Sequence, residues 1–444
     1  MPSNKFLPTL NLVLAIVGYQ FATNLAMPFY GIDVESATNQ VTIPYRLFTI
    51  AIATIVIVQS FRKQKVILKQ NRTTKFLMVF WFLLLLRLFY DLQIRTDIFI
   101  QQAEAFRIWP YVLLLCLYCG FSVAISYKKI DMHLAFRFTA FALTISLILS
   151  LVYNPLLLAN SIEIDTRLEG NAALKTIVFG QMGLSAVIIG ACMMYSERSI
   201  FLKYIIPIFL VIFGALISLR SGSRGPLISF FAIVVFAIIA YSKKPLVGFM
   251  AVFLFIGLIV AFSQYILTLI ERIAPVLAER LMYTTTNEDR TVLYQEAWER
   301  FVYNPFFGDR FAIIYPDGSY IYSHNMILDA LMGMGFFGGI IFLAMYFSVT
   351  IDAYKLIKYD KKKYMWIVFI LIQQMAAGMV SGAFYLKPVL TILIIFIALS
   401  TTNYRKVRIL YQQTSDKESV SSTKIRTITQ NFVRESKIGY RPFV

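Results

Sequence analysis

Long apolar runs separated by short polar segments make up most of the chain. An α-helix needs about 20 mostly apolar residues to cross the hydrocarbon core of a bilayer, and the runs have about this length. The pattern therefore predicts an all-α polytopic membrane protein with about twelve membrane-spanning helices. The expected spans are residues 5–27, 43–61, 75–93, 106–126, 134–153, 172–195, 199–219, 226–241, 245–269, 326–351, 364–385 and 387–401.

The composition agrees with this class. With 58% hydrophobic and 15% charged residues, the chain has more apolar surface than a soluble core can bury. The net charge of +18 does not indicate nucleic-acid binding, because most basic residues flank apolar runs, where they orient the protein and contact anionic membrane lipids. Cys116, Cys119 and Cys192 lie inside apolar runs, so we interpret them as packing residues.

Basic residues mark alternate connections between the expected spans. The segment 61–75 holds six basic residues and no acid, whereas 30–40 holds two acids and no base, and 160–171 holds three acids and one arginine. Because Lys and Arg collect in cytoplasmic loops, we predict that both termini are cytoplasmic and that the acidic connections face outward.

This orientation divides the chain into two parts. Residues 1–401 form a transmembrane domain with a large outer loop at 270–325, between the ninth and tenth spans. Residues 402–444 form a polar, basic tail with little apolar material to fold it, so we expect it to be cytoplasmic and largely disordered.

The stretch "SLRSGSRGPL" at 218–227 places Arg220 and Arg224 on the expected outer side, against the charge bias. Its small residues, Ser223 among them, leave backbone N–H groups accessible, and Pro226 suits the first turn of a helix. A helix start with free amides and guanidiniums binds oxyanions. The alternative is a tight turn whose arginines reach lipid phosphates.

The long outer loop contains five arginines and no lysine. Guanidinium suits planar, bidentate recognition of phosphate or carboxylate, which hints at an oxyanion ligand. The alternative, which we prefer for most of the five, is ion pairing with the loop's acids. The arginines are Arg272, Arg280, Arg290, Arg300 and Arg310, and the acids are Glu271, Glu279, Glu288, Asp289, Glu296, Glu299, Asp309 and Asp317.

Within this loop, "TTTNEDRTVLYQEAWERF" predicts an amphipathic helix. Thr285 and Glu288 can form a capping box at its start, and Asn304 with Pro305 ends it. One face carries Leu293, Ala297 and Phe301.

Two further residues are candidates because of their position. His324 lies where the long loop re-enters the membrane, and an imidazole with an ordinary pKa near 6.5 can act as a general base; an interfacial hydrogen-bonded histidine is the alternative. Arg87 lies within the third span, where charge is costly. Asp91, one turn away, offers a simple ion pair, and a role in a substrate cavity is the alternative.

The ordered set of motifs resembles the O-antigen polymerase and O-antigen ligase superfamily of bacterial envelope glycosyltransferases. Three elements carry the resemblance over about 120 residues. They are "SGSRG" at 221–225, the string formed by Arg290, Trp298, Pro305 and Gly308, and "HN-x2-L" at His324, Asn325 and Leu328 followed by "GFFG" at 335–338.

The resemblance implies a metal-independent, GT-C-like glycosyltransferase without a cofactor in the bacterial inner membrane. Its donor and acceptor would be undecaprenyl-diphosphate-linked glycans at the outer face, its reaction an inverting transfer, and a chain-length regulator protein its partner. His324 and Arg290 are the catalytic candidates. The candidates for binding diphosphate or substrate are Arg220, Ser223, Arg224, Arg310, Arg87 and Asn325. The sequence "GDR" at 308–310 departs from the family's Gly-x-Gly.

Three alternatives remain open at this stage. We favour a polymerase, which lengthens one lipid-linked chain with another, over a ligase, which transfers the chain to lipid A-core. A transporter or flippase of lipid-linked oligosaccharide would need polar residues through the membrane middle, whereas the candidate residues gather at the outer face. A non-catalytic envelope scaffold is the third alternative.

Overall fold

The computed structural model describes residues 5–30, 35–63, 71–94, 108–154, 157, 168–170, 174–282, 288–314 and 320–418. In chain order the elements are α1 (Phe6–Val13), the π-helical turn η1 (Leu14–Gly18), α2 (Tyr19–Leu25), α3 (Met27–Tyr30), α4 (Glu35–Lys63), α5 (Arg72–Gln93), the π-helix η2 (Tyr111–Tyr118), α7 (Cys119–Ser126), η3 (Tyr127–Lys129), α8 (Met132–Tyr153), α9 (Thr176–Ser196), η6 (Phe201–Ile205), α10 (Ile206–Arg220), α11 (Arg224–Tyr241), α12 (Pro245–Ala261), α13 (Ser263–Ile273), α14 (Pro275–Met282), α15 (Glu288–Tyr303), β1 (Ile313–Ile314), β2 (Tyr320–Ile321), α16 (Met326–Tyr359), α17 (Lys361–Val380), η8 (Phe384–Leu386) and α18 (Pro388–Glu418).

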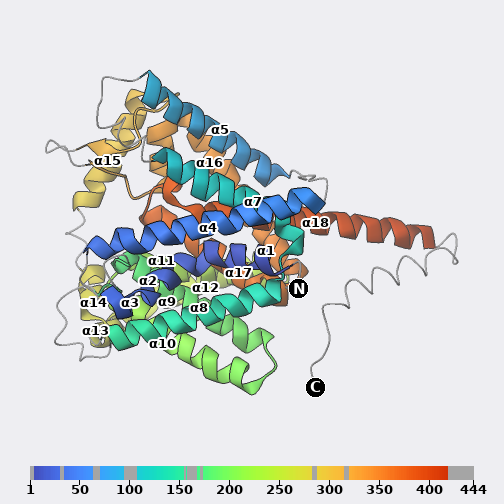
Figure 1. Cartoon of the computed structure of the whole chain (residues 1–444). Coiled ribbons are helices and arrows are strands. Elements are labelled where there is room, and N and C mark those ends of the chain that lie inside the picture. The colour runs from blue at the N-terminus through green and yellow to red at the C-terminus, as the bar shows by residue number, and fades with distance from the viewer. Residues whose placement is uncertain are drawn as a thin grey trace.

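The structure confirms an all-α polytopic membrane fold. Across the described ranges, ten helices are long and apolar enough to cross a membrane, or eleven if the bent pair α12 and α13 counts as one span. They follow the expected spans in order. The twelfth expected span, 387–401, corresponds to a shorter apolar helix at 388–403, the first part of α18. Most of these helices run side by side along one direction (Figure 1).

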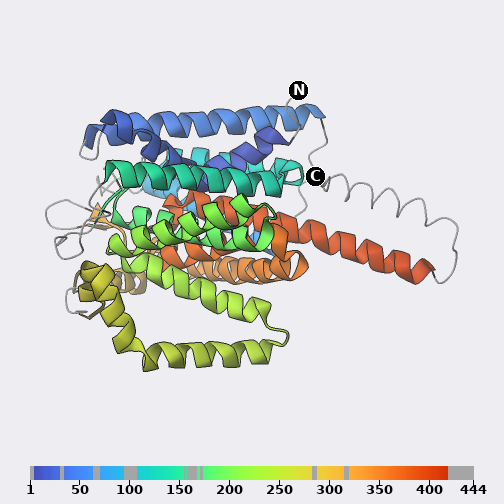
Figure 2. The same ribbon diagram turned by 90° about the horizontal axis from the view of Figure 1, so that it is seen from below.

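The span expected at 245–269 is not one continuous helix, because it breaks at Phe262. α12 and α13 meet there at an angle of 66°. α12 is uniformly apolar, whereas α13 carries Gln264, Glu271 and Arg272, so α13 turns away from the path of α12. Figure 2 shows α12 at the edge of the bundle and α13 turning from it.

The outer loop expected at 270–325 is a folded segment. α13, α14 and α15 gather at one end of the bundle, which we call the loop end, opposite the end from which α18 projects (Figure 1). A two-residue antiparallel ladder pairs Ile313 with Ile321. The expected amphipathic helix is α15, which ends at Tyr303, before Asn304. Its Leu293 and Ala297 are buried. The side chains of the expected capping box lie outside the described residues.

The tail is partly helical. α18 continues to Glu418, whereas the composition predicts an unfolded tail from 402. Residues 419–444 lie outside the described part of the chain.

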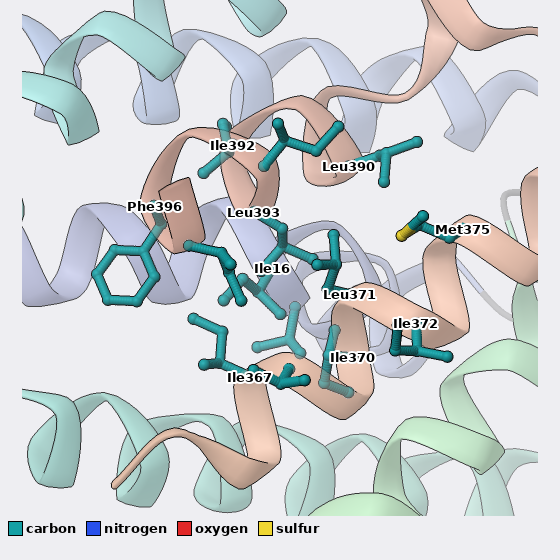
Figure 3. Packing of buried hydrophobic residues seen from close by; sticks show 14 of the residues in the cluster. Ile16, Ile367, Ile370, Leu371, Ile372, Met375, Leu390, Ile392, Leu393 and Phe396 are labelled. Carbon is teal, nitrogen blue, oxygen red and sulfur yellow. The ribbon is translucent and has the colours of Figure 1, made fainter. Parts of the chain in front are cut away.

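Apolar side chains fill the space between the inner helices. Residues of α17 and α18, with Ile16 of η1, form one part of this core (Figure 3). Cys116, Cys119 and Cys192 are free and buried, as the packing interpretation predicts.

A buried polar network fixes α9, α11 and α17 to one another. Gln373 Nε2 donates to the carbonyl oxygen of Gln181 at 2.7 Å and to its Oε1 at 2.8 Å. Gln181 Nε2 donates to Ser229 Oγ at 3.1 Å, and Ser185 Oγ donates to Gln373 Oε1 at 3.0 Å. In a bilayer no water competes for these groups, so the network specifies how the three helices are placed.

α9 and α10 approach closely through two glycines. A Cβ on Gly183 would lie 2.5 Å from the carbonyl oxygen of Gly214, and a Cβ on Gly214 would lie 2.6 Å from that of Gly183. Small residues of this kind let membrane helices pack backbone against backbone.

We expect Gly183→Leu to destabilise the protein, because overpacking costs about 1–3 kcal/mol and here the obstacle is backbone. Gly257→Leu is the matched control, since a Cβ there meets nothing within 4 Å. Thermal unfolding in detergent, followed by size-exclusion of the surviving protein, measures the difference. Equal midpoints for the two variants would show that the glycine contact does not hold the bundle.

Candidate active site

The turn at 221–223 joins α10 to α11 at the loop end. Its three amides are used internally: those of Ser221 and Gly222 donate to main-chain oxygens of α10, and that of Ser223 approaches Ser221 Oγ at 3.4 Å. Ser223 is buried at the N-cap position of α11, without a side-chain cap hydrogen bond. The expectation that the amides of 221–223 are free is therefore wrong.

α11 begins at Arg224, two residues before the start expected at Pro226. Proline is tolerated in the first turn, because the N–H groups there have no intrahelical acceptor. The amides of Arg224 and Gly225 have no acceptor in the described ranges. The positive end of the helix dipole therefore coincides with the Arg224 side chain.

Arg224 and Arg280 each donate a hydrogen bond to a main-chain oxygen of the other's segment. The guanidinium of Arg224 donates to the carbonyl oxygen of Arg280, and Arg280 Nη1 donates to that of Gly222 at 3.0 Å. This contact seats α14 on the turn. Burial lowers the pKa of Arg280, and the nearby charge of Arg290 lowers it further. Arg224 also experiences the charges of Arg280 and Arg290, so the three guanidiniums form one arginine cluster.

Arg290, in the first turn of α15, is half-buried and makes no hydrogen bond or ion pair with any described residue. The loop arginines thus divide. Arg300 lies 3.4 Å from Glu296 and 3.8 Å from Asp309, and Arg310 lies 2.7 Å from Asp309, as the ion-pair alternative predicts. Arg280 and Arg290 pair with no acid in the described segments. The side chains of Glu288, Asp289 and Asp317 lie outside the described residues.

His324 is held in an unusual backbone conformation. Its φ is 60°, the only left-handed value for a non-glycine residue in the described ranges. Such a conformation costs about 1–3 kcal/mol and persists where the surroundings enforce it. Here Asp329 Oδ1 accepts from the amide of Ser323 at 2.9 Å and from its hydroxyl at 2.7 Å. Asn325 caps α16 by accepting from the amides of Ile327 and Leu328.

The imidazole of His324 is oriented, and its surroundings disfavour the protonated form. Its ring packs edge-on against Tyr322 with centroids 4.5 Å apart. Burial lowers its pKa below the ordinary 6.5, and the charge of Arg290 lowers it further. Nδ1 is buried and has no hydrogen-bond partner among the described residues. His324 therefore stands beside the arginine cluster with a nitrogen still to be satisfied.

α16 is broken at Gly335, where φ is 65°. The turn after α15 packs into the break: the amide of Phe336 donates to Pro305 at 2.6 Å, and the amide of Asp309 to Met332 at 2.7 Å. A Cβ on Gly308 would lie 2.5 Å from backbone atoms of Gly333, and one on Gly335 would collide with Phe306. The helix that carries Arg290 and the half-helix that follows His324 are thereby joined.

The remaining arginine candidates each donate a hydrogen bond to a neighbouring group. Arg87 binds Asp91 at 3.1 Å and donates to the carbonyl oxygens of residues 307, 308 and 309, so it holds the turn after α15. Arg220 Nη1 donates to the carbonyl oxygen of Leu157 at 2.8 Å, and Arg310 binds Asp309. The structure thus brings together Arg224, Arg290 and His324, and places Arg220, Arg310 and Arg87 in supporting contacts.

Sequence reasoning missed four residues of the site. Arg280 was grouped with the arginines expected to pair with acids, and Tyr322, Ser323 and Asp329 have no motif of their own. The acid that follows "HN" by four residues is the one usable signal, since one helical turn separates it from Asn325. Within the described segments, no three His, Cys, Asp or Glu side chains gather as a metal site would.

Comparison with known proteins identifies the segment that carries this site. No curated protein matches the chain. A family model described as O-antigen ligase matches residues 208–343, which include the turn, the arginine cluster, α15 and His324. Enzymes of this family are glycosyltransferase-like, of the O-antigen ligase and polymerase type. The resemblance drawn from the motifs is confirmed: residues 208–343 form an O-antigen ligase-like domain, consistent with the O-antigen polymerase and ligase superfamily.

Proposed function

We propose that the protein is a metal-independent polymerase of lipid-linked polysaccharide repeat units. It transfers a glycan from undecaprenyl diphosphate to a sugar hydroxyl of a second lipid-linked unit, with inversion. The observation that carries the proposal is the arginine cluster without a described acidic partner, lying beside a neutral histidine.

The cluster suits the leaving group. In the transfer, the acceptor oxygen bonds to the anomeric carbon while the bond from that carbon to the diphosphate breaks and its electron pair passes to the phosphate oxygen. The lipid diphosphate leaves with one more negative charge. Arg224, Arg280 and Arg290, with the first amides of α11, are fixed before that charge appears, which is how electrostatic stabilisation of a transition state works.

His324 suits the acceptor. The neutral imidazole accepts the proton that the acceptor hydroxyl loses. Ser323 and Asp329 are positioning residues, since they hold the backbone of His324.

The proposed location is the bacterial inner membrane, with both termini cytoplasmic and the loop end facing the periplasm or cell exterior. Basic connections support this orientation. Tyr127–Lys129 ends one span, and Lys243 and Lys244 join α11 to α12, at the end of the bundle opposite the arginine cluster.

A ligase that transfers the glycan to lipid A-core is the second candidate, because the matching family model is described as O-antigen ligase. It would use the same donor site with a different acceptor. Purified protein supplied with lipid-linked repeat units alone separates the two. We expect a ladder of longer glycans, and product that requires a lipid A-core acceptor would overturn the polymerase assignment.

Replacing Arg290 tests the cluster. We expect Arg290→Ala to lower the transfer rate by about 10²–10³-fold, the typical cost of removing one fixed donor to a developing charge. Arg300→Ala, three turns along the same helix, is the control, because Arg300 pairs with acids. Steady-state transfer by both variants, at matched folding, is the measurement. Similar rates for the two would remove Arg290 from the site.

The protonation of His324 is a second test. The chain has only 2 histidines, so ¹³C-histidine NMR of a His133→Gln variant follows His324 alone. We expect its pKa to lie below 6.5, so the imidazole is neutral above that pH. Arg290→Gln should raise this pKa, because removing a nearby positive charge stabilises the protonated ring. Titration at or above the ordinary value, unchanged by Arg290→Gln, would contradict the geometry.

A further inference from the structure

A further guanidinium lies near the loop end, outside the arginine cluster. Arg46 is six residues inside the candidate span Gln40–Arg62, or about 9 Å along the axis of α4, which begins at the loop end (Figure 1). Its guanidinium faces the ring of Tyr111, 5.3 Å from the centroid, and forms no hydrogen bond or ion pair with a described residue. An ionisable group inside a span is costly and marks a functional site by default.

Three tyrosines surround Arg46. The rings of Tyr19 and Tyr45 pack edge-to-face with centroids 5.9 Å apart. The charge of Arg46 acts on Tyr19 and on Tyr111, and no described carboxylate acts on any of the three tyrosines. The guanidinium is therefore set among aromatic rings, without a described counter-ion. The side chains of the nearest acids along the chain lie outside the described residues; they are Asp33, Glu35, Asp97 and Glu104.

Irregular helices place these side chains. η1 and η2 are both π-helical, a rare geometry that is frequent at functional sites, and η2 begins with the tyrosine that Arg46 faces. A Cβ on Gly18 of η1 would lie 2.9 Å from the Tyr45 ring, whose hydroxyl donates to the carbonyl oxygen of Leu14 at 2.7 Å. Pro44 interrupts the hydrogen bonding of α4 two residues before Arg46. Three departures from the regular α-helix thus meet around one guanidinium.

The level of the guanidinium in the membrane favours the headgroup of an amphiphile. Tyr111 is three residues inside its own span, Ile108–Lys129, or about 5 Å along the axis, so Arg46 reaches toward the outer boundary. The Tyr111 hydroxyl makes no hydrogen bond with a described residue. A guanidinium binds phosphate through paired N–H groups, and an aromatic ring packs against the face of a sugar. The arrangement therefore suits a sugar joined to phosphate.

The two groups of arginines are separate. Arg46 is not among the charges that act on Arg224, Arg280 or His324. The elements also differ, because Arg46 and its tyrosines come from α2, α4 and η2, whereas the arginine cluster comes from α11, α14 and α15.

We propose that Arg46, with Tyr19, Tyr45 and Tyr111, forms a second site, which binds the phosphate-linked sugar of a second lipid-linked glycan. The inference rests on the proposed function. It supplies what a polymerase needs and a ligase does not: a place for the acceptor's own lipid-linked end while its far sugar reaches the arginine cluster.

Binding stoichiometry tests the second site without reference to activity. The probe is N-acetylglucosaminyl farnesyl diphosphate, counted by native mass spectrometry on the full chain. We expect two bound per wild-type chain and one bound by Arg46→Gln, whose second affinity falls by more than about tenfold because a charge-assisted hydrogen bond is lost. Arg62→Gln, at the other end of the same helix, is the control and should still bind two. Arg224→Gln/Arg290→Gln should lose the other molecule.

Two further measurements show what Arg46 and Tyr111 do. If Arg46 waits for a ligand, Arg46→Gln removes an unpaired charge from the membrane, so its thermal midpoint should equal or exceed that of the wild type. A lower midpoint would mean that Arg46 pairs with an acid of the chain, and would overturn the site. Tyr111→Leu should weaken the sugar-bearing probe more than it weakens farnesyl diphosphate, because the lost ring contacts the sugar; equal weakening would contradict the sugar assignment.

The outcomes separate the second site from the proposed function. One probe bound by the wild type, or two by Arg46→Gln, overturns the second site. Displacement of the Arg46-dependent molecule by an equal concentration of phosphatidylglycerol overturns the substrate assignment, because the site would then hold ordinary lipid headgroups. Two specific sites in a protein that forms no glycan bond would instead support the second site and contradict the polymerase.

Discussion

Two guanidiniums of like charge are held side by side because each donates to a main-chain oxygen of the other's segment. The contact of Arg224 with the Arg280 carbonyl, and of Arg280 with the Gly222 carbonyl, fastens α14 to the start of α11. Carbonyl oxygens orient a guanidinium without neutralising it, whereas a carboxylate would do both. The positive charge therefore survives in a partly desolvated place, and the position of α14 and α15 over the turn depends on the same contact.

The membrane-embedded half of the structure makes that contact possible. The 221–223 turn rests on α9, where a Cβ on Gly180 would collide with Ser221. One residue further along, Gln181 enters the amide network with Gln373 and Ser229. A bilayer strengthens such a network, because its hydrocarbon core holds no water to form hydrogen bonds with an unsatisfied amide. The turn is consequently held on its membrane side by packing on α9, which the amide network fixes, and on its loop side by the hydrogen bond from Arg280 to Gly222.

Much of the fold follows from one-dimensional properties of the sequence. Hydropathy gives the spans and their order, and Asn304 with Pro305 gives the end of α15. The motifs indicate Arg224, Arg290 and His324, which the structure brings together. Three features that the sequence does not show depend on backbone geometry. They are the helix break at Phe262, the left-handed φ of His324 and the hydrogen bond from Arg280 to a main-chain carbonyl oxygen. Arg300 and Arg280 are the same residue type in the same loop, and only three-dimensional placement decides that Arg300 meets carboxylates whereas Arg280 meets none among the described residues.

The break at Gly335 has a mechanical consequence. A continuous α16 would tie the loop end to the far side of the bundle through 34 residues of rigid rod. The break isolates the first half-helix, and the backbone contacts with residues 305–309 attach that half-helix to α15. Arg290 and His324 thus flank one packed unit, formed by α15, the turn at 305–309 and the first half of α16. We therefore expect membrane fluctuations to tilt this unit as a whole, so that the spacing between His324 and Arg290 stays constant while the surrounding helices move.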